Sequence, residues 1–346
     1  MLLQPTEAGL YCPDGDFYID PGLRVPRAVI THAHADHLRG GCGAYLLAEV
    51  GLAVARARLE PEVVVQAVPY GTVVELGGVR VSLHPAGHIL GSAQVRLERS
   101  GEVWVVSGDY TRAPNPTCAP FEPLRAHTFV TESTFGLPIF HWPPAGEVFA
   151  AIDAWWQANA AAGRASLLYG YALGKAQRLL ASVDATIGPI YTHGAVERMT
   201  ALYREVGITL PATVAVREMP ARGGSWGGAL IVAPPSAHGS AWSRRFGDAS
   251  TAFVSGWMRV RGTRRRRAVD RGFVLSDHAD WSALLATIAE TGAERVWVTH
   301  GHGTTLARLL RERGLEAKAI ATQFAGEHDD PAELPTQEHS GGDRAG

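Results

Sequence analysis

The sequence predicts an α/β fold in which one α/β domain is inserted into another, and three observations lead to this prediction. The first third of the chain consists of short runs rich in Val, Ile, Thr and aromatic residues, separated by Pro and Gly turns. From about residue 145, helical and strand patterns alternate, as is typical of parallel β/α units. After about residue 270, short strands joined by helices return.

The individual elements follow from hydrophobic periodicity and turn residues. In the first third, strands are predicted at residues 16–20, 27–32, 63–68, 79–86, 93–98, 103–109 and 128–133, with one helix at 48–59. Later helices are predicted at residues 145–163, 174–185, 195–207, 280–292 and 304–314, and later strands at 164–171, 189–193, 272–276, 295–300 and 317–321.

These elements predict a first domain in two parts, residues 1–140 and 271–325, and an inserted domain at residues 141–270. The tail at residues 326–346 is acidic and poor in apolar residues, so we expect it to be disordered.

Composition narrows the functional classes. Hydrophobic residues make up 46% and charged residues 19% of the 346 residues, and the net charge of −2 gives no overall nucleic-acid signature. Cys12, Cys42 and Cys118 provide no disulfide framework and fit a reducing compartment. The first residues lack a signal-peptide pattern, and no apolar run reaches the length of a membrane span. We therefore expect a cytoplasmic protein with no membrane partner.

Metal-ligand side chains are concentrated in the stretch HAHADH, which follows the apolar run RAVI. This stretch contains His32, His34, Asp36 and His37. A polar turn that happens to be rich in histidine is the alternative interpretation, which such a density of ligands disfavours.

Further potential ligands follow apolar runs elsewhere in the chain. His88 lies in PAGHILGS after a predicted strand, while Asp109 in VVSGDY and His300 in VTHGHG each lie at the end of one. Because strand ends can converge on one rim of a sheet, we expect these side chains to join the histidine-rich stretch. Imidazole and carboxylate without thiolate suit zinc, with manganese and iron as alternatives. Asp20 either orients one of the histidines or forms a turn before proline.

The pattern HAHADH resembles the HxHxDH signature of the metallo-β-lactamase superfamily. Asp20, the HAHADH stretch, His88 and Asp109 match the first four motifs of that superfamily in order. The resemblance spans residues 12–315 and implies an αββα sandwich.

Later stretches resemble the beta-CASP nucleases within that superfamily. VTESTFG places Glu132 at motif A, LSDHADW places His278 at motif B, and VTHGH places His300 at motif C. YALGKAQRLL resembles part of the inserted α/β domain of the group.

The resemblance implies two divalent metal ions, most simply zinc, with manganese or iron as alternatives. One ion would be held by His32, His34, His88 and Asp109, and the other by Asp36, His37, Asp109 and His300. Two such ions support in-line attack of water on a phosphodiester. The catalytic residues would be Asp36, His278 and Glu132, with His278 protonating the leaving 3′ oxygen while Glu132 orients it. A surface carboxylate is the alternative for Glu132.

Residues 259–271, RVRGTRRRRAVDR, contain seven arginines, whose guanidinium groups suit phosphate oxygens. A solvated arginine-rich loop is the alternative interpretation. The predicted nucleic-acid contacts are Lys175, Arg259, Arg261, Arg264, Arg265, Arg266 and Arg267.

DNA is favoured over RNA as the substrate. YCPDGDFYIDP, SGWMRVRG and SDHADW resemble the bacterial ligase-associated DNA exonucleases. This resemblance implies exonuclease action with 5′ polarity in DNA end processing and repair, with an ATP-dependent DNA ligase and a helicase as partners. His300 at motif C is instead typical of RNA-processing members, so an RNA-processing beta-CASP ribonuclease is the alternative.

Two other classes fit the residues less well. A lactamase or thioesterase would leave the inserted domain, Glu132 and His278 unexplained. A non-catalytic binding module would be expected to have lost some of the metal ligands, whereas this sequence retains all of them.

Overall fold

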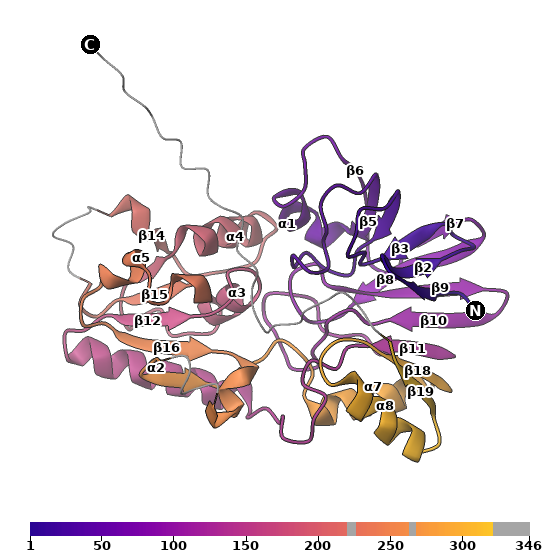
Figure 1. Cartoon of the computed structure of the whole chain (residues 1–346). Coiled ribbons are helices and arrows are strands. Elements are labelled where there is room, and N and C mark those ends of the chain that lie inside the picture. Colours follow the sequence, from indigo (N-terminus) through magenta and orange to yellow (C-terminus); the bar gives the residue numbers. More distant parts are fainter. Residues whose placement is uncertain (220–225, 263–267, 321–346) are drawn as a thin grey trace, which may run out of the picture.

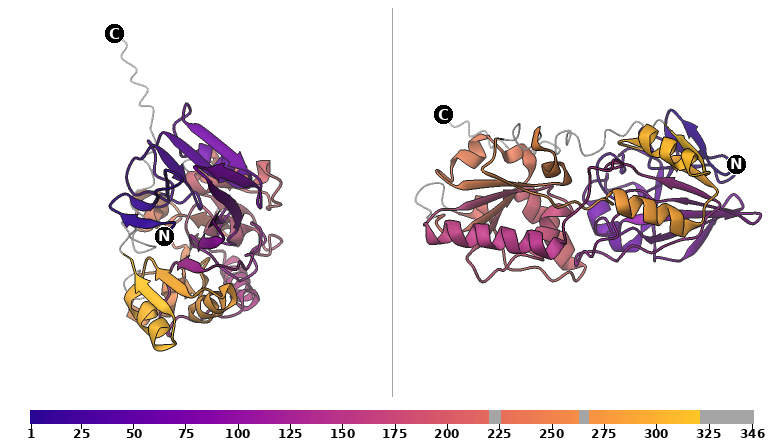
Figure 2. Two further views of the ribbon diagram at one scale, coloured as in Figure 1. Left: turned by 90° about the vertical axis from the view of Figure 1, so that its right-hand side faces the viewer. Right: turned by 90° about the horizontal axis from the view of Figure 1, so that it is seen from below.

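The computed structural model describes residues 1–219, 226–262 and 268–320. These residues form three β-sheets distributed over two lobes that lie side by side (Figures 1 and 2). The first and last parts of the chain build one lobe, and the middle part builds the other. The mixture of helices and several sheets agrees with the α/β fold that the sequence predicts.

The first sheet contains six strands in chain order. They are β1 (Gln4–Thr6), β2 (Gly9–Cys12), β3 (Phe17–Ile19), β4 (Arg27–Val29), β5 (Ala44–Ala48) and β6 (Val64–Val68). The first three strands are antiparallel, and β3 to β6 are parallel. Because β4 is parallel to its neighbours, its carboxyl end delivers the histidine-rich stretch to one edge of the sheet.

The second sheet joins the two ends of the chain. Its order is β19 (Glu316–Ala319), β18 (Arg295–Val298), β11 (Thr128–Thr131), β10 (Glu102–Val106), β9 (Ala93–Arg99), β8 (Val79–Pro85) and β7 (Val73–Leu76). Thr128 of β11 pairs in parallel with Arg295 of β18, although 167 positions separate them. The middle part of the chain therefore leaves after β11 and returns before β18.

The core of this lobe lies between its two sheets. Leu3, which precedes β1, packs in one cluster with Phe17 and Ile19 of the first sheet and with Val81, Leu97 and Trp104 of the second. All six are at most 1% exposed. On the outer faces, η1 (Glu49–Gly51) and α1 (Leu52–Arg56) cover the first sheet, while α7 (Trp281–Thr291) and α8 (Gly303–Glu312) cover the second. The result is a four-layered helix–sheet–sheet–helix arrangement.

The sequence of α7 explains its limits and its buried face. Asp280 caps the amino terminus, because its carboxylate accepts a hydrogen bond from the Ala283 N–H at 2.8 Å. Gly292 ends the helix with φ of 64°, a left-handed conformation that glycine adopts without a steric penalty. Between these ends, the buried positions Leu284, Thr287, Ile288 and Thr291 recur with helical spacing.

The middle lobe is a parallel sheet with helices on both faces. Its strand order is β14 (Val214–Ala215), β13 (Ile190–Thr192), β15 (Leu230–Ala233), β12 (Ser166–Tyr169), β16 (Ser250–Val254) and β17 (Arg271–Phe273). Its helices are α2 (Ala145–Ala161), α3 (Lys175–Leu180), α4 (Gly194–Glu205) and α5 (Ala241–Arg244), with short 3₁₀ turns η2 (Val216–Glu218), η3 (Pro235–Ala237) and η4 (Gly256–Arg259).

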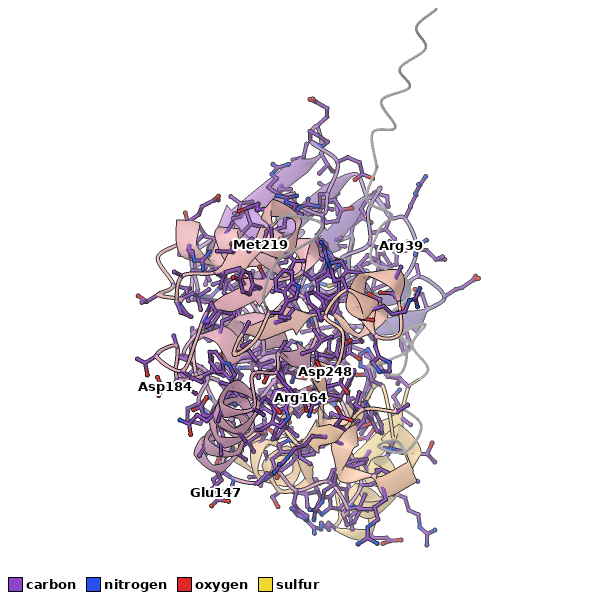
Figure 3. All side chains as sticks on the ribbon, turned by 90° about the vertical axis from the view of Figure 1, so that its left-hand side faces the viewer. Arg39, Glu147, Arg164, Asp184, Met219 and Asp248 are labelled. Carbon is purple, nitrogen blue, oxygen red and sulfur yellow. The ribbon has the colours of Figure 1, made fainter. Side chains whose placement is uncertain are left out.

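Apolar packing on both faces of the sheet and hydrogen bonds at its outer end stabilise this lobe. Apolar clusters pack on each face of the sheet, as expected for strands whose four residues are all buried, such as β12 and β15. At the outer end, the Arg164 guanidinium donates to the Asp248 carbonyl oxygen at 3.0 and 2.7 Å, which joins the start of β12 to the start of β16 (Figure 3).

The structure differs from the predicted elements in several places. Residues 48–59 form only η1 and α1, and the preceding apolar residues form strand β5. Strands β1, β2, β7, β14, β15 and β16 have no counterpart in the prediction. β1 and β7 are short and have exposed residues, whereas β15 and β16 are almost entirely buried, so their apolar runs lack the alternation typical of a half-exposed strand. β17 hydrogen-bonds to β16, so it joins the middle sheet although the predicted boundary lies at residues 270/271.

Two further expectations concern regions at the limits of the structure. The tail at residues 326–346 lies outside the described residues. Among the residues that are described, no helix combines the length and hydrophobicity needed to cross a bilayer.

The two-sheet core predicts a clear difference between two identical substitutions. Leu97→Ala should reduce the free energy of unfolding by about 2–5 kcal/mol, because Leu97 is fully buried and the change leaves a cavity. Leu23→Ala is the matched control, since Leu23 is 39% exposed and should cost less than about 1 kcal/mol. Urea titration of both variants measures the difference, and equal losses would contradict this account of the core.

Candidate metal centre

The predicted metal ligands lie at strand ends and in the loops beside them. His32, His34 and His37 follow β4, His88 lies between β8 and β9, and Asp109 follows β10. One ligand atom from each of His32, His34, His88 and Asp109 lies within 4.8 Å of the others. The structure therefore assembles the first predicted ligand set from three separate segments.

The distances within this set suit one metal ion. His34 Nδ1 lies 3.0 Å from His32 Nε2 and 3.1 Å from His88 Nε2. Asp109 Oδ2 lies 3.6 Å from His32 Nε2 and 3.9 Å from His88 Nε2. Ligands placed tetrahedrally about 2.0–2.1 Å from a zinc ion are about 3.3 Å apart. The observed separations bracket that value.

Hydrogen bonds on the outer side of the rings fix which nitrogen faces the centre. His34 Nε2 lies 3.2 Å from the Leu173 carbonyl oxygen, and His88 Nδ1 lies 2.8 Å from the Asp277 carbonyl oxygen. A carbonyl oxygen only accepts, so we assign the N–H of each ring to these atoms. The lone pairs of His34 Nδ1 and His88 Nε2 then face each other at 3.1 Å. A shared cation resolves this repulsion, and the donor set therefore fits a metal ion.

Asp20 hydrogen-bonds His37 directly and reaches His32 through Thr31. Its Oδ2 accepts from His37 Nδ1 at 2.8 Å and from the Thr31 hydroxyl at 2.6 Å, and its Oδ1 accepts from the Thr31 N–H at 2.8 Å. The Thr31 oxygen in turn lies 3.1 Å from His32 Nδ1. Because Nδ1 is engaged on both rings, Nε2 of His32 and of His37 faces the centre.

The second predicted ligand set lies next to the first. His37 Nε2 is 3.3 Å from Asp109 Oδ2 and 3.8 Å from Asp36 Oδ2. The rings of His37 and His300 are 5.4 Å apart, and Thr299 Oγ1 engages His300 Nδ1 at 2.7 Å. Asp109 thus contacts both sets, which is the position required of a ligand shared by two ions. The side chain of Asp36 is 35% exposed, whereas those of His37 and Asp109 are 1% and 9% exposed.

The charges of the site follow from burial and from the neighbouring carboxylates. Burial lowers the pKa of His32 and of His88 well below the usual histidine value, so both rings are neutral, the form that binds metal. Burial alone would also lower the pKa of His37, but Asp109, Asp36 and Asp20 raise it well above that value. Burial alone would raise the pKa of Asp109, whereas positive charge at His37 holds it well below its usual range.

The predicted pair Glu132 and His278 adjoins this group. Glu132 Oε2 lies 2.8 Å from His278 Nδ1, and its Oε1 accepts from the Tyr110 N–H at 2.8 Å. Glu132 is only 1% exposed, which excludes the surface carboxylate that the sequence left open. The ring of His278 lies 4.6 Å from that of His88, and ligand atoms of Asp109, Glu132 and His278 also lie within 4.8 Å of one another.

Backbone geometry and packing at the strand ends allow this convergence. Asp20 and His300 adopt left-handed conformations, with φ of 44° and 52°, which are uncommon for residues other than glycine. Gly108 has φ of 57°, and a Cβ atom there would meet Thr31 at 2.6 Å.

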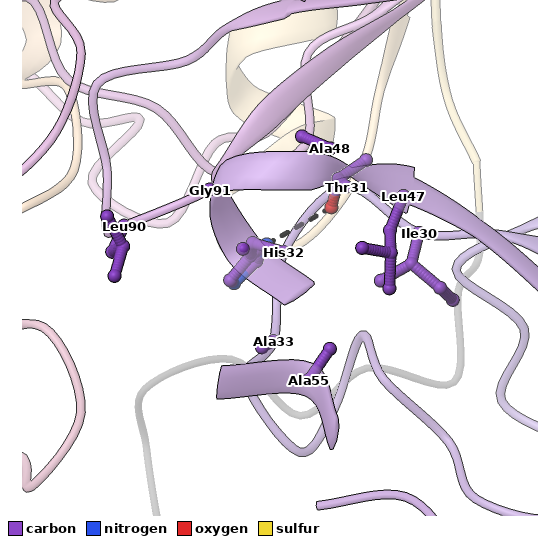
Figure 4. Close-up of a pocket in the computed structure, with 10 residues that line it drawn as sticks. Ile30, Thr31, His32, Ala33, Leu47, Ala48, Ala55, Leu90 and Gly91 are labelled. Atoms are coloured by element: carbon purple, nitrogen blue, oxygen red, sulfur yellow. Dashed lines mark hydrogen bonds between the residues drawn. The ribbon is translucent and has the colours of Figure 1, made fainter. Parts of the chain in front are cut away.

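A small cavity lies against His32, lined mainly by aliphatic side chains such as Leu47 and Leu90 (Figure 4).

Of the predicted nucleic-acid contacts, the structure contradicts one, leaves two possible and does not describe the other four. Lys175 is 1% exposed and its ammonium lies 2.7 Å from Asp277 Oδ2, so the prediction that Lys175 reaches a phosphate is wrong. Arg259 and Arg261 are exposed, as a phosphate contact requires. Arg264, Arg265, Arg266 and Arg267 lie outside the described residues.

Several residues that hold the site are not identified by the sequence analysis. Thr31, Leu173, Tyr110, Asp277 and Thr299 each engage a predicted site residue through a hydroxyl or a backbone atom. A backbone carbonyl or N–H gives no residue-type signal. Thr31 and Thr299 are exceptions, because each hydroxyl directly precedes a predicted ligand in the sequence, His32 and His300 respectively.

Comparison with known sequences identifies relatives concerned with nucleic acids. The chain is 34% identical over 315 residues to a protein of Opitutus terrae named a probable DNA ligase, a match covering 90% of this chain and 30% of that protein. It is 32% identical over 122 residues to endoribonuclease YSH1 of Candida albicans and 30% identical over 122 residues to that of Saccharomyces cerevisiae. These two matches cover 35% of this chain and 14% and 15% of the endoribonucleases.

This chain therefore spans less than a third of the length of these relatives. No protein-family model matches the sequence. The printed names of these relatives concern the ligation or cleavage of nucleic acids, and the His/Asp group of this chain could hold a metal ion.

The fold also resembles a solved structure. A crystal structure of a protein of unknown function from Enterococcus faecalis V583 superposes with a TM-score of 0.57 and 12% sequence identity. The match covers 86% of this chain and 79% of that chain. At this identity the likeness concerns the fold alone.

The geometry around Asp20 predicts a metal-binding defect without direct loss of a ligand. Asp20→Asn should weaken zinc binding by about 10–100-fold, because the amide cannot accept in the same way from His37 and Thr31. Asp16→Asn is the matched control, since Asp16 is exposed and its carboxylate contacts Arg27 and Tyr11 at the surface. Competition with a chromophoric chelator measures both affinities, and unchanged binding in Asp20→Asn would contradict the role of Asp20.

Proposed function

We propose that this chain is a two-metal phosphodiesterase of the beta-CASP group, with an αββα metallo-β-lactamase domain interrupted by an α/β domain. Its proposed activity is DNA exonuclease action with 5′ polarity, in DNA end processing and repair. The observation that carries the proposal is the placement of the Glu132–His278 pair beside a His/Asp ligand group that shares Asp109.

The proposed ligands divide into two sets. His32, His34, His88 and Asp109 would hold one cation, and Asp36, His37, Asp109 and His300 the other. Zinc is proposed for both on the basis of imidazole and carboxylate donors, with manganese and iron as alternatives. When bound, such cations activate water and neutralise the charge that develops on the phosphoryl oxygens.

The remaining chemistry belongs to His278 and Glu132. Hydrolysis of a phosphodiester requires a proton on the leaving oxygen, and an imidazolium is suited to donate it near neutral pH. Glu132 accepts from His278 Nδ1, which directs the proton on Nε2 away from Glu132 and stabilises the charged ring. The Tyr110 N–H holds the other oxygen of Glu132, so the carboxylate has one orientation.

DNA is proposed as the substrate because of the extent of the matches. Similarity to the protein named a probable DNA ligase covers 90% of this chain, whereas similarity to the endoribonucleases covers 35%. That same relative supports a partnership with an ATP-dependent DNA ligase. A helicase partner follows only from the sequence resemblance, and a cytoplasmic location from the sparse cysteines. RNA processing remains the second candidate, favoured by His300 and by the endoribonuclease matches.

Cleavage assays test the proposed activity. Wild-type protein with zinc or manganese should shorten end-labelled single-stranded DNA faster than matched RNA. Asp36→Ala should abolish cleavage by removing a metal ligand, and His278→Ala should slow it by about 10²–10⁴-fold by removing the proton donor. Zinc analysis should show that His278→Ala retains its metal.

His127→Ala serves as the control, because His127 is exposed and hydrogen-bonds only the Val103 N–H in the described structure. If His278→Ala cleaves DNA at the wild-type rate, His278 is not the proton donor. Cleavage of RNA alone would replace the DNA proposal with the RNA-processing alternative, and cleavage of neither would reject the nuclease.

The exposed arginines predict a change in salt dependence. The Arg259→Ala/Arg261→Ala variant should bind single-stranded DNA more weakly, because two phosphate contacts are lost. The slope of log Kd against log salt should fall by about 1.4, at about 0.7 for each phosphate on a single strand. Fluorescence anisotropy at several salt concentrations measures the slope. Arg308→Ala on α8, with a side chain 76% exposed, should leave it unchanged.

A further inference from the structure

Three buried charged side chains, Lys175, Arg178 and Asp277, form a cluster at the junction of the two lobes, here termed the Asp277 cluster. Lys175 and Arg178 are each 1% exposed and Asp277 is 3% exposed. Lys175 Nζ lies 2.7 Å from Asp277 Oδ2, and Arg178 Nη1 lies 2.7 Å from Asp277 Oδ1. Both carboxylate oxygens of Asp277 are therefore held by cations of helix α3.

The cluster also connects three segments of backbone. Arg178 donates from Nη1 to the Ser276 carbonyl oxygen at 2.8 Å and from Nη2 to the Pro114 carbonyl oxygen at 3.2 Å. Lys175 donates to the Leu275 carbonyl oxygen at 3.2 Å. Helix α3 of the middle lobe is thereby fixed to the loop that follows β17 and to a loop of the first lobe.

The peptide held by this cluster contacts the metal centre directly. The Asp277 carbonyl oxygen accepts from His88 Nδ1 at 2.8 Å, and the next residue is His278. Just before the amino terminus of α3, the Leu173 carbonyl oxygen accepts from His34 Nε2 at 3.2 Å. Gly174 has φ of 88°, and a Cβ atom there would meet Ile89 at 2.2 Å, so this loop packs closely against the ligand loop.

We propose that the Asp277 cluster is a positioning device through which the middle lobe sets the orientation of His34 and His88 and so completes the metal centre. Asp277, Lys175 and Arg178 act through the two carbonyl oxygens and are positioning residues. The inference rests on the proposed function only in requiring that the centre binds a cation, and it does not require nuclease activity.

The energetics favour a role in placement over a role in stability alone. A buried ion pair loses about as much solvation free energy as it gains from attraction, so it contributes little net stability. Its removal on one side is nevertheless costly, because an unpaired charge remains in the interior. A cluster of this kind specifies one arrangement of the segments that it joins. Here, the joined segments contain the Leu173 and Asp277 carbonyl oxygens, which accept hydrogen bonds from His34 and His88.

Zinc affinity and the spectrum of the cobalt-substituted protein test the proposal. Asp277→Asn keeps the backbone carbonyl but leaves Lys175 and Arg178 unpaired. It should weaken zinc binding tenfold or more and change the energy or intensity of the visible cobalt bands, which report ligand geometry. Glu197→Gln is the matched control, since it removes a partly buried ion pair with Arg204 in the same lobe, away from the centre. It should leave the zinc affinity and cobalt spectrum as in the wild type.

Loss of thermal stability in Asp277→Asn with a wild-type zinc affinity and cobalt spectrum would overturn the proposal, because the cluster would then serve only folding. If Asp277→Asn does not fold, Lys175→Met replaces it, since the Asp277–Arg178 pair remains. Lys175→Met should weaken zinc binding at least threefold, and wild-type values would overturn the proposal.

The outcomes separate this inference from the proposed function. Wild-type protein that binds zinc but cuts neither DNA nor RNA would contradict the nuclease, while the variants would still decide the role of the cluster. Wild-type protein that binds none of zinc, manganese and iron would overturn both.

Discussion

The structure depends on the orientation of a set of buried imidazole rings. Each ring has two nitrogens, and an acceptor outside the centre must take the N–H of one for the lone pair of the other to face inward. Leu173, Asp277 and Thr31 provide such acceptors for His34, His88 and His32, while Asp20 accepts from Nδ1 of His37, whose pKa the surrounding carboxylates raise. Inward lone pairs repel one another in a buried site, so the arrangement is favourable only when a cation lies among them.

The same requirement explains why the two lobes cannot be treated as independent. The first lobe contributes the ligands, but two of the outer acceptors come from segments bordering the middle sheet: Leu173 just before α3 and Asp277 just after β17. Burying Lys175 and Arg178 at this junction is costly, and Asp277 offsets the cost by pairing with both. The junction therefore has one preferred arrangement, which is also the arrangement that orients His34 and His88.

Carboxylates of the site have separate tasks because their surroundings differ. Asp109 faces neutral and charged imidazoles, and the positive charge at His37 keeps its pKa well below the usual range although burial opposes this. Glu132 lies beside the centre but directs both oxygens elsewhere, to His278 and to the Tyr110 N–H. Asp20 lies behind the ligands and engages Thr31 and His37. The roles proposed for Asp109, Glu132 and Asp20 thus differ because their hydrogen-bond partners differ, although all three residues are carboxylates.

The sequence by itself determined the α/β class, the order of many elements and the identity of the residues that converge. The converging residues could be predicted because histidines and aspartates that follow apolar runs are recognisable in the sequence alone. It also placed Glu132 with His278 through motif resemblance. Only the tertiary structure decided how those residues are held, since carbonyl and N–H groups such as those of Leu173 and Tyr110 are the same in every residue. It also contradicted the prediction for Lys175. A lysine can be buried when a carboxylate pairs with it, and the partner of Lys175, Asp277, lies 102 positions away in the sequence. Pairing across such a distance is a property of the folded chain, which local pattern does not encode.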